Sequence, residues 1–559
     1  MSRPLGPHPL SPAGRVGALR EMVAEPLELL VVGGGITGAG VARDAALRGM
    51  RVGLVEKTDF GAGTSSRSSK IIHGGVRYLE YLQLGLVRES ARERRILRRL
   101  APHLVHPLPF LYPVYRGESL LKIQAGLKLF DLLAGNPRGE RSRRLDPEGT
   151  RKYLPGLREP LKGSVLYPEY ITDDARFTLA NIASAATAGA RVANHARVER
   201  FLVESGRVVG AAVRDLERGR DFEVRADVTV NATGPWAQRT LLQSGFDVPS
   251  PLVPSKGIHI LLERSRLPLR AATFLKSSTG RAGLAMPRGP WVYVGTSDEE
   301  YRDDLDHARA TGEEARELLE MTRDCFPGAG LEFRHIRATW AGIRPLIREE
   351  GKATRDMSRH DEIWSTPPGL VTIAGGKLTT YRPMARRILR AVARANGRSL
   401  PGRDRTAEVP LAGNPGEDPE RFHRRVRTRL RREGVAEVTL DRIEQLYGTE
   451  AETLLTYGEE DPDWLRPLAP RTPALRGEVR LAVEREMALT LEDILDRRLA
   501  LLLFTTDGGV EASGEAADIA GGLLGWDRDR KSRETATYER LALEHGPPDA
   551  RKLPRERSR

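Results

Sequence analysis

The residues best suited to chemistry begin near the N-terminus, in the string Gly33-Gly34-Gly35-Ile36-Thr37-Gly38. An apolar run precedes the string, a helix-like segment follows it, and a second apolar run ends at Glu56. Gly33 permits a tight turn, Gly35 lets the backbone approach a pyrophosphate, and Gly38 lets the helix pack on the strand. Glu56 would accept hydrogen bonds from an adenosine ribose. The pattern predicts a dinucleotide-binding unit, with FAD and NAD both open.

Two further apolar runs end in turns of small residues. One leads into Ala232-Thr233-Gly234, and the other leads through Gly375-Gly376-Lys377-Leu378-Thr379 into a helix. Three such turns, spread over about 340 residues, suit a long cofactor lying across a sheet better than a compact NAD module. A helix that begins near Lys377 can point its positive end at a flavin ring and stabilise the charge of the reduced form. These turns therefore favour FAD.

A segment rich in hydroxyl groups follows the first unit. Short side chains can hydrogen-bond a pyrophosphate or a flavin edge without crowding it, and paired glycines let the backbone pass close to a ring. A flexible loop would explain the serines but not the string HGGVRYLE that comes after them. We therefore expect cofactor contacts from this segment, at Thr64, Ser65, Ser66, Ser69, His73, Gly74 and Gly75.

Composition limits the class of protein. A chain of 559 residues exceeds the length at which a single core stops growing, so at least two domains are expected. Cys325 is the only cysteine, which excludes an internal disulfide and a cysteine-held iron–sulfur cluster, so redox chemistry must use a bound cofactor. The net charge of +13 suggests attraction to polyanions. No zinc-finger spacing or aromatic-interleaved basic motif is present, so neither a metal site nor nucleic-acid binding is predicted.

At residues 31–80 the chain closely resembles the FAD-dependent sn-glycerol-3-phosphate dehydrogenases. The resemblance continues in the same order to about residue 505, through the strings YITDDARFTLANI, VNATGPWA, SKGIHIL, VGTSD, WAGIRPL, AGGKLTTYRPMA and EMALTLEDILDRR. It implies oxidation of sn-glycerol 3-phosphate to dihydroxyacetone phosphate, with electrons passed to membrane quinone. A same-fold oxidase that uses oxygen, or another small hydroxy or amino acid substrate, is the alternative.

The resemblance also implies residue roles. Arg77 and Tyr78 correspond to contacts with the substrate phosphate, Arg344 and Lys377 complete the charged pocket, and Arg355 is a weaker candidate. His259 is the expected base, because an imidazole can take a proton near neutral pH. His73 is the rival base, although its neighbouring glycines suggest flavin contact instead. Arg344 would also stabilise an alkoxide developing at C2 of the substrate.

The expected fold is α/β, with an FAD-binding Rossmann-like domain, a mixed-sheet substrate domain and a C-terminal all-helical domain. Residues 1–26 are expected to form a flexible tail without a signal peptide. The two catalytic domains interleave over 27–395, with substrate parts at about 105–175 and 240–350. A linker over 396–418 and a helical domain over 419–545 follow, and the pair Thr490 and Asp493 predicts a capping box.

Quinone as acceptor requires contact with a bilayer, but no apolar run is long enough to span one. Leu120, Ile123, Leu127 and Phe130 recur at helical spacing beside Lys122 and Lys128, which predicts a helix lying in a membrane interface. The same helix docked on a core is the alternative. The expected location is cytoplasmic, on the inner face of the membrane at an anionic lipid surface, and a homodimer is possible. A basic scaffold that keeps flavin only structurally is the non-enzyme alternative.

Overall fold

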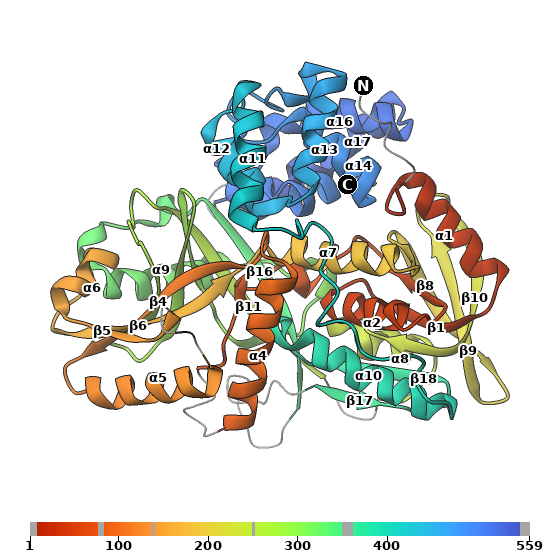
Figure 1. Ribbon diagram of the computed structural model, residues 1–559, viewed down its shortest axis with the longest axis horizontal. Coiled ribbons are helices and arrows are strands. Elements are labelled where there is room, and N and C mark those ends of the chain that lie inside the picture. The colour runs from red at the N-terminus through yellow and green to blue at the C-terminus, as the bar shows by residue number, and fades with distance from the viewer. Residues whose placement is uncertain are drawn as a thin grey trace, which may run out of the picture.

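The computed structural model describes residues 8–76, 83–135, 137, 140–248, 252–348 and 361–547. Two sheets stand side by side, and the C-terminal helices form a layer above them (Figure 1). The predicted α/β class with a C-terminal helical domain is confirmed. Within the described part of the chain, no helix is both long enough and apolar enough to cross a membrane.

The first sheet contains the three strands that end in glycine-rich turns. Its order is β17-β18-β10-β1-β2-β7, and β18, β10, β1, β2 and β7 run parallel. The carboxyl ends of parallel neighbours meet at one edge, so the turns after β1, β10 and β18 lie side by side. Its strands are β1 (Leu27–Val32), β2 (Val52–Val55), β7 (Arg191–Ala193), β8 (Ala196–Glu204), β9 (Arg207–Asp215), β10 (Arg220–Asn231), β17 (Glu362–Trp364) and β18 (Leu370–Ala374).

Helices cover both faces of this sheet. On one face α2 (Ile36–Leu47), α7 (Asp174–Thr187) and α10 (Tyr381–Asn396) bury alanine-rich and aliphatic surfaces against the parallel strands. Small side chains on α2 allow close approach: a Cβ at Gly40 would lie 2.6 Å from the ring of Tyr381 on α10. On the other face α8 (Ala237–Gln243) and an N-terminal helix pack with β8 and β9.

The N-terminal helix corrects the expectation of a flexible tail over residues 1–26, of which the first seven lie outside the described residues. Helix α1 spans Pro12–Ala24, and Ser11 caps it by accepting a hydrogen bond from Gly14 N at 3.0 Å. Leu19 and Met22 are buried against the first sheet, and Arg15 is buried in an ion pair with Asp215 at 2.8 Å. A serine cap and Pro at the first helical position favour this helix despite the Pro- and Gly-rich composition.

The second sheet is mixed, because β4 and β12 pair in parallel while the other pairs are antiparallel. Its order is β15-β11-β14-β13-β12-β4-β6-β3, with β16 paired to β11 and β5 to β6. The strands are β3 (Ile71–Ile72), β4 (His106–Tyr115), β5 (Arg143–Leu145), β6 (Leu161–Ile171), β11 (Leu252–Glu263), β12 (Ala272–Lys276), β13 (Ala282–Arg288), β14 (Trp291–Gly295), β15 (Glu299–Glu300) and β16 (Ala338–Ile347).

The helices described beside the second sheet are α4 (Leu84–Leu100), α5 (Leu120–Ala134), α6 (Pro147–Tyr153) and α9 (Gly312–Cys325). Helix α9 packs on the sheet through Ala315, Leu318 and Leu319, and Cys325 is buried at its end. Burial raises the pKa of the Cys325 thiol to about 11, so this cysteine is a packing residue.

Helix α5 forms as predicted, but the face expected to meet the membrane is buried. Leu120, Leu127 and Phe130 are at most 8% exposed because they pack toward the sheet and toward α4. The opposite face is also apolar, with Leu121 and Leu132 71% and 77% exposed. The helix therefore has two apolar stripes, and the spacing of residues in the sequence does not show which stripe faces outward. The packing of α5 in the folded protein shows it.

The C-terminal layer is helical. Residues 397–418 carry neither helix nor strand, and α11 begins at Pro419. Asp493 N donates to Thr490 Oγ1 and Thr490 N donates to Asp493 Oδ2, both at 3.1 Å, which confirms the predicted capping box. The helices are α11 (Pro419–Arg432), α12 (Glu437–Leu446), α13 (Glu450–Glu460), α14 (Arg476–Glu486), the π-helix η10 (Asp493–Arg498), α15 (Leu501–Phe504), α16 (Val510–Leu524) and α17 (Arg528–His545).

Candidate active site

In the turn between β1 and α2, the backbone packs closely against the backbone of neighbouring segments. Gly33 has φ +110°, and a Cβ there would lie 2.6 Å from the carbonyl oxygen of Ala232. A Cβ at Gly38 would lie 1.9 Å from the carbonyl oxygen of Gly33. Only glycine fits at both places, so the start of α2 stands directly at the edge of the sheet beside the turn at Ala232.

The acceptors at this turn fit a dinucleotide. Glu56 Oε2 accepts from Gly34 N at 2.7 Å, which fixes the carboxylate at the end of β2, where a ribose would bind. Ser65 Oγ accepts from Ile36 N at 2.9 Å, at the N-terminus of α2. This amide belongs to the group of donors that a phosphate binds at a helix N-terminus. Thr37 lies in the same first turn of α2.

The turns after β10 and β18 complete the edge. Thr233 Oγ1 donates to Asn231 Oδ1 at 2.7 Å, and Gly234 follows with φ +58°. Gly376 has φ +104°, and a Cβ there would lie 2.2 Å from Met384 Cε. Lys377 then precedes the short 3₁₀ helix η8 (Leu378–Thr380), which contains Thr379 and leads into α10. The predicted arrangement of three neighbouring turns is confirmed.

His259 lies on β11 of the second sheet, opposite Gly295 of β14 on one side and Trp340 of β16 on the other. Its ring stacks on Trp340 with centroids 4.6 Å apart, and its Nε2 is hydrogen bonded to Ser69 Oγ at 2.9 Å. Nδ1 is buried with no hydrogen-bond partner among the described residues. Burial, followed by the charges of Arg344 and Lys70, lowers the pKa of His259 well below 6.5, so the imidazole is neutral at pH 7.

Arg344 reaches the same place from β16. Its backbone is opposite Ser255, and its side chain lies over Gly257, where a Cβ would be 2.3 Å from one guanidinium nitrogen. Gly257 and His259 are two residues apart on one strand and so share a face. The guanidinium donates to Thr296 Oγ1 at 2.8 Å and to Asp298 Oδ1 at 3.2 Å. The missing Cβ at position 257 therefore lets a fixed cation stand beside a neutral imidazole.

Other predicted site residues occupy different places. Thr64 Oγ1 donates to the carbonyl oxygen of Ile343 at 2.6 Å, and Ser66 is buried with its hydroxyl toward Gly63. Gly74 N donates to the buried carboxylate of Glu169 at 2.7 Å. His73 is exposed, and Gly75 has φ +90°. Arg77, Tyr78 and Arg355 lie outside the described residues.

Sequence reasoning missed several residues of this site. Gly257, Thr296, Asp298 and Trp340 surround His259 and Arg344, although each belongs to a string already singled out. The available signal was that SKGIHIL, VGTSD and WAGIRPL are all strand-like and each carries a glycine. Strand pairing brings these three strings together, and pairing between β11, β14 and β16 is not visible in any one of them.

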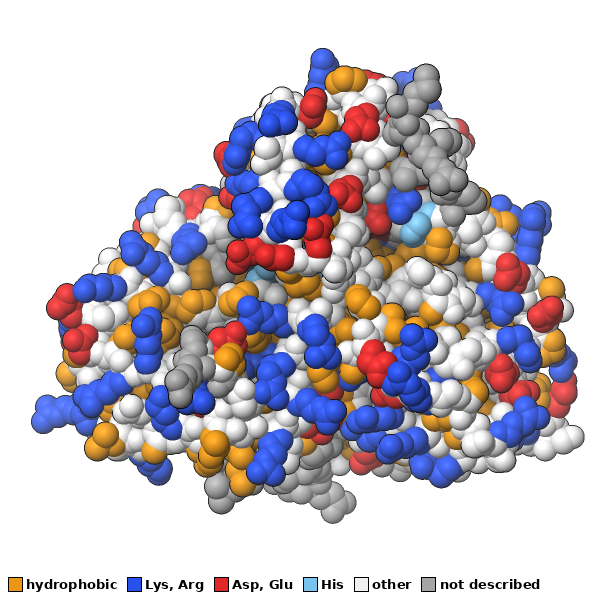
Figure 2. Space-filling view, in the orientation of Figure 1, with side chains coloured by type: hydrophobic (Ala, Val, Ile, Leu, Met, Phe, Trp, Pro, Cys, Tyr) orange, Lys and Arg blue, Asp and Glu red, His pale blue; other side chains and the backbone are white. Residues whose placement is uncertain are grey.

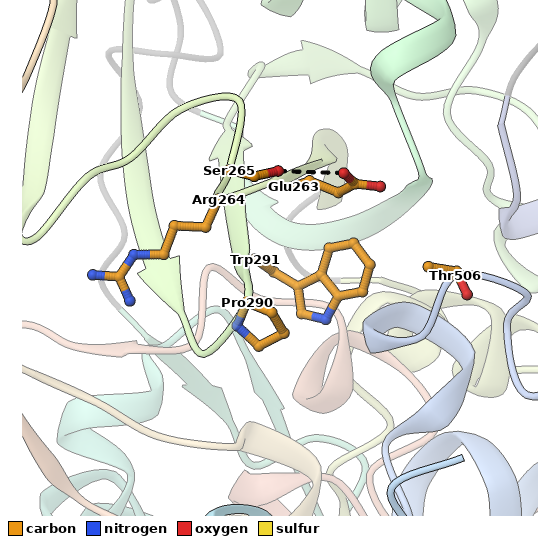
Figure 3. Close-up of a pocket in the computed structure, with 6 residues that line it drawn as sticks. All are labelled: Glu263, Arg264, Ser265, Pro290, Trp291 and Thr506. Carbon is orange, nitrogen blue, oxygen red and sulfur yellow. Dashed lines mark hydrogen bonds between the residues drawn. The ribbon is translucent and has the colours of Figure 1, made fainter. Parts of the chain in front are cut away.

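A surface cleft lies away from His259 and Arg344. Figure 3 shows it between the β11–β14 end of the second sheet and Thr506 of the C-terminal layer. Trp291 is four residues from Gly295 along β14, about 13 Å at the rise of a strand, so the cleft is separate from His259. Its lining residues are Glu263, Arg264, Ser265, Pro290, Trp291 and Thr506.

The fold and the site together define an α/β flavoprotein oxidoreductase. Residues 28–382 match the family described as FAD dependent oxidoreductase, and residues 404–531 match the C-terminal domain of alpha-glycerophosphate oxidase. The chain belongs to the FAD-dependent glycerol-3-phosphate dehydrogenase family, and FAD is its cofactor.

The relatives cover nearly the whole chain. The aerobic glycerol-3-phosphate dehydrogenase of Bacillus subtilis (strain 168) is 34% identical over 96% of this chain and 98% of its own. The glycerol-3-phosphate dehydrogenase of Mycobacterium leprae (strain TN) is 37% identical over 95% of this chain and 90% of its own. The structure of the glycerol-3-phosphate dehydrogenase from Bacillus halodurans complexed with FAD has a TM-score of 0.80 and 32% identity, covering 98% of this chain and 100% of that one.

Proposed function

We propose that this protein oxidises sn-glycerol 3-phosphate to dihydroxyacetone phosphate, with FAD as the hydride acceptor and membrane quinone as the final electron acceptor. One observation carries the proposal: a buried neutral imidazole, His259, and a fixed guanidinium, Arg344, stand together on neighbouring strands. The names of the relatives supply the substrate class.

Bound FAD supplies the acceptor for the hydride that leaves C2 of the substrate. The residues proposed to hold FAD belong to the three turns and to the segment after β2. Gly33, Gly35 and Gly38 give the backbone close approach, Glu56 takes the ribose, and Ser65 stands at the N-terminus of α2. The turn at Gly376 to Thr379 lies at the same edge of the sheet.

His259 is the proposed proton acceptor. Oxidation of C2 releases one hydride to the cofactor and one proton from the C2 hydroxyl, so a base has to take that proton. The lowered pKa keeps His259 unprotonated in the free enzyme, and a phosphate anion beside it would offset the charges of Arg344 and Lys70 that lower it. Ser69 and Trp340 fix the ring, so the base is oriented before substrate binds.

Arg344 is proposed to stabilise negative charge on the substrate. A guanidinium held by Thr296 and Asp298 is already oriented, so little entropy is lost when it binds an oxyanion or a phosphate. Lys377 is proposed to add charge at the edge of the first sheet. Arg77, Tyr78 and Arg355 remain proposed phosphate contacts on the resemblance alone.

The test is the visible spectrum of the purified protein under anaerobic conditions. Addition of sn-glycerol 3-phosphate should bleach the flavin band, and a quinone analogue should restore it faster than air does. Faster recovery in air would make the protein an oxidase. A yellow protein that does not bleach would mean that the substrate is wrong.

The proposed membrane contact is peripheral, on the inner face of the cytoplasmic membrane. The outer stripe of α5, Leu121, Leu129 and Leu132, is exposed, and Lys122 lies beside it. Exposed leucines with a neighbouring cation favour insertion into the headgroup region of an anionic bilayer. This stripe replaces the inner stripe of the same helix as the candidate surface.

A further inference from the structure

The C-terminal layer buries three consecutive charged residues at the end of its π-helix. Asp496, Arg497 and Arg498 are at most 6% exposed, and all three contact the catalytic part of the chain. In an α-helix, consecutive side chains point in directions about 100° apart, so three in a row rarely face one interface. A π-helix is wider and often occurs at functional sites. The π-helical turn Asp493–Arg498 therefore fits the contact of all three charges with the catalytic part of the chain.

The two arginines meet Asp59, which follows β2. Arg498 donates to both oxygens of Asp59, at 2.6 and 2.8 Å, and Arg497 Nε donates to Oδ2 at 2.7 Å. Arg497 also pairs with Asp493, whose other oxygen is 2.9 Å from His195 Nε2. The buried charges are thus paired, as charges in a low-dielectric interior have to be. These contacts join the helical layer to the first sheet.

Asp496 makes a separate contact, with the loop that enters the active site. Arg67 donates to Asp496 Oδ1 at 3.3 Å and to Oδ2 at 2.6 Å, and both side chains are largely buried. The carbonyl oxygen of Arg67 rests on β16, where a Cβ at Gly342 would lie 2.5 Å from it. The Arg67 backbone is therefore held between β16 and the C-terminal layer.

Two of the hydroxyl side chains in the loop Thr64–Lys70, one on either side of Arg67, make different contacts. Ser65 accepts from the first turn of α2, on the nucleotide side, and Ser69 is bonded to His259 on the substrate side. A shift of Arg67 would strain both hydroxyl positions, because they lie only two residues away from it, and it would act against the bond of Ser68 to Asp174.

A small void, no larger than one water molecule needs, lies beside this ion pair. Ser66, Arg67 and Lys70 line it on the loop side, and Asp496, Leu503 and Phe504 line it on the C-terminal side. Incomplete packing on this side leaves Arg67 tied to the C-terminal layer through its ion pair with Asp496. The loop is also anchored on its other side, where Ser68 Oγ donates to Asp174 at 2.7 Å and Tyr293 OH donates to the carbonyl oxygen of Ser69 at 3.0 Å.

We propose that Asp496 is a positioning residue for the reaction, which holds Arg67 so that Ser69 orients His259. The proposal rests on the function proposed above. It makes the C-terminal helical layer contribute to the active site, although no residue of its described part is hydrogen bonded to His259.

The test uses the flavin-loaded full chain and the variants Asp496→Asn and Asp215→Asn. Asp215 forms a similarly buried pair with Arg15, and neither side chain is bonded to the described loop Thr64–Lys70, so it reports general loss of a buried ion pair. Asp496→Asn should retain flavin and slow anaerobic bleaching by sn-glycerol 3-phosphate about 100-fold, since small misplacements of a catalytic group cost that much. Asp215→Asn should bleach at the wild-type rate.

A double-mutant comparison separates positioning from general damage. In a Ser69→Ala background, Asp496→Asn should slow bleaching by less than about threefold, because the contact through which it acts is already gone. Equal slowing in both backgrounds, or no slowing in the single variant, would overturn the proposal. If Asp496→Asn loses flavin or fails to fold, Arg67→Lys takes its place; Arg67→Lys at the wild-type rate would also overturn it.

Amide hydrogen exchange tests the loop without any substrate. Exchange over residues 64–70 of the flavin-loaded protein should be faster in Asp496→Asn than in Asp215→Asn and wild type, and equal exchange would overturn the proposal. A wild-type protein that does not bleach would count against the proposed function alone, since the exchange result is independent of the substrate.

Discussion

At the scale of single residues, the active site depends as much on missing side chains as on those present. Gly257, Gly295 and Gly342 lie on three neighbouring strands, and a Cβ on any of them would come within 2.5 Å of an atom of the site. The three contacts are with Arg344, His259 and Arg67, respectively. The proposed base, the arginine proposed to bind substrate and the arginine held by Asp496 thus all occupy space that glycine leaves open.

Gly257→Ala should therefore displace Arg344 without removing it. We expect kcat/KM for sn-glycerol 3-phosphate to fall about 100-fold with flavin retained, close to the effect of Arg344→Ala, because the guanidinium can no longer lie beside His259. Gly126→Ala is the matched control, since a Cβ there meets nothing within 4 Å and alanine favours a helix. Normal kcat/KM in Gly257→Ala would show that the position of Arg344 is unimportant.

The sequence predicts local motifs better than it predicts contacts between residues that are far apart in the chain. The first glycine string, Glu56 and the capping box could all be predicted, because each is a local pattern with one physical explanation. The sequence predicts Ser69 as a cofactor contact, and it does not predict the bond that Ser69 makes to His259, 190 positions away. That contact depends on the way β11 and the loop Thr64–Lys70 meet, which no local pattern encodes.

At the scale of elements, short connections between the two sheets and the C-terminal layer are fixed by buried charge. His195 lies between β7 and β8 with φ +48°, and its Nε2 is 2.9 Å from Asp493 Oδ2. Burial alone would lower the pKa of His195, but the charge of Asp493 and its hydrogen bond raise it above 6.5. The imidazolium is therefore favoured in the folded protein.

Because the pKa of His195 is raised in the folded protein, the free energy of unfolding should decrease as the pH rises above neutrality. The stabilisation that the ion pair between His195 and Asp493 gives the folded protein is complete below the pKa of histidine in the unfolded chain, near 6.5. It is lost as the pH rises through the higher pKa of His195 in the folded protein. Between pH 6 and pH 9 the Tm of wild type should fall about 2 °C further than that of His195→Asn, in which asparagine tolerates the left-handed backbone. His307→Asn, in an exposed pair with Asp304, should behave as wild type. Parallel curves for His195→Asn and wild type would contradict the assignment.

Helices α1 and α5 show what element prediction misses. Residues 12–24 look like a tail by composition, yet a cap, a proline at the first position and the spacing of Leu19 and Met22 suffice for a buried helix. Helix α5 is predicted correctly, but the choice between its two apolar stripes needs the positions of α4 and the second sheet. Periodicity gives a helix and its candidate faces, and tertiary packing selects among those faces.

At the scale of the whole molecule, some of the positive charge is neutralised by ion pairs and some is exposed to solvent. Many arginines of α11 pair with carboxylates, such as Arg427 with Glu437 and Arg429 with Glu459, so that much of its charge is compensated. Arg88 and Arg92 of α4, the helix that packs against α5, are exposed. Figure 2 shows hydrophobic and basic side chains mixed along the lower edge of the molecule, where Figure 1 places α5 and α4.

That lower edge is where we expect a lipid surface to bind. Wild type should float with vesicles that contain phosphatidylglycerol, and Leu121→Ser with Leu132→Ser should reduce binding at least about 10-fold, because each buried leucine contributes roughly 1.5–3 kcal/mol. Val438→Ser on α12 is the matched control: it removes an exposed apolar side chain from the opposite side of the molecule and should leave flotation unchanged. Binding should weaken with added salt, since the arginines of α4 would attract the anionic headgroups. A wild-type protein that stays in the dense fraction would mean that electrons reach quinone without this surface, and an equal loss in Val438→Ser would move the contact away from α5.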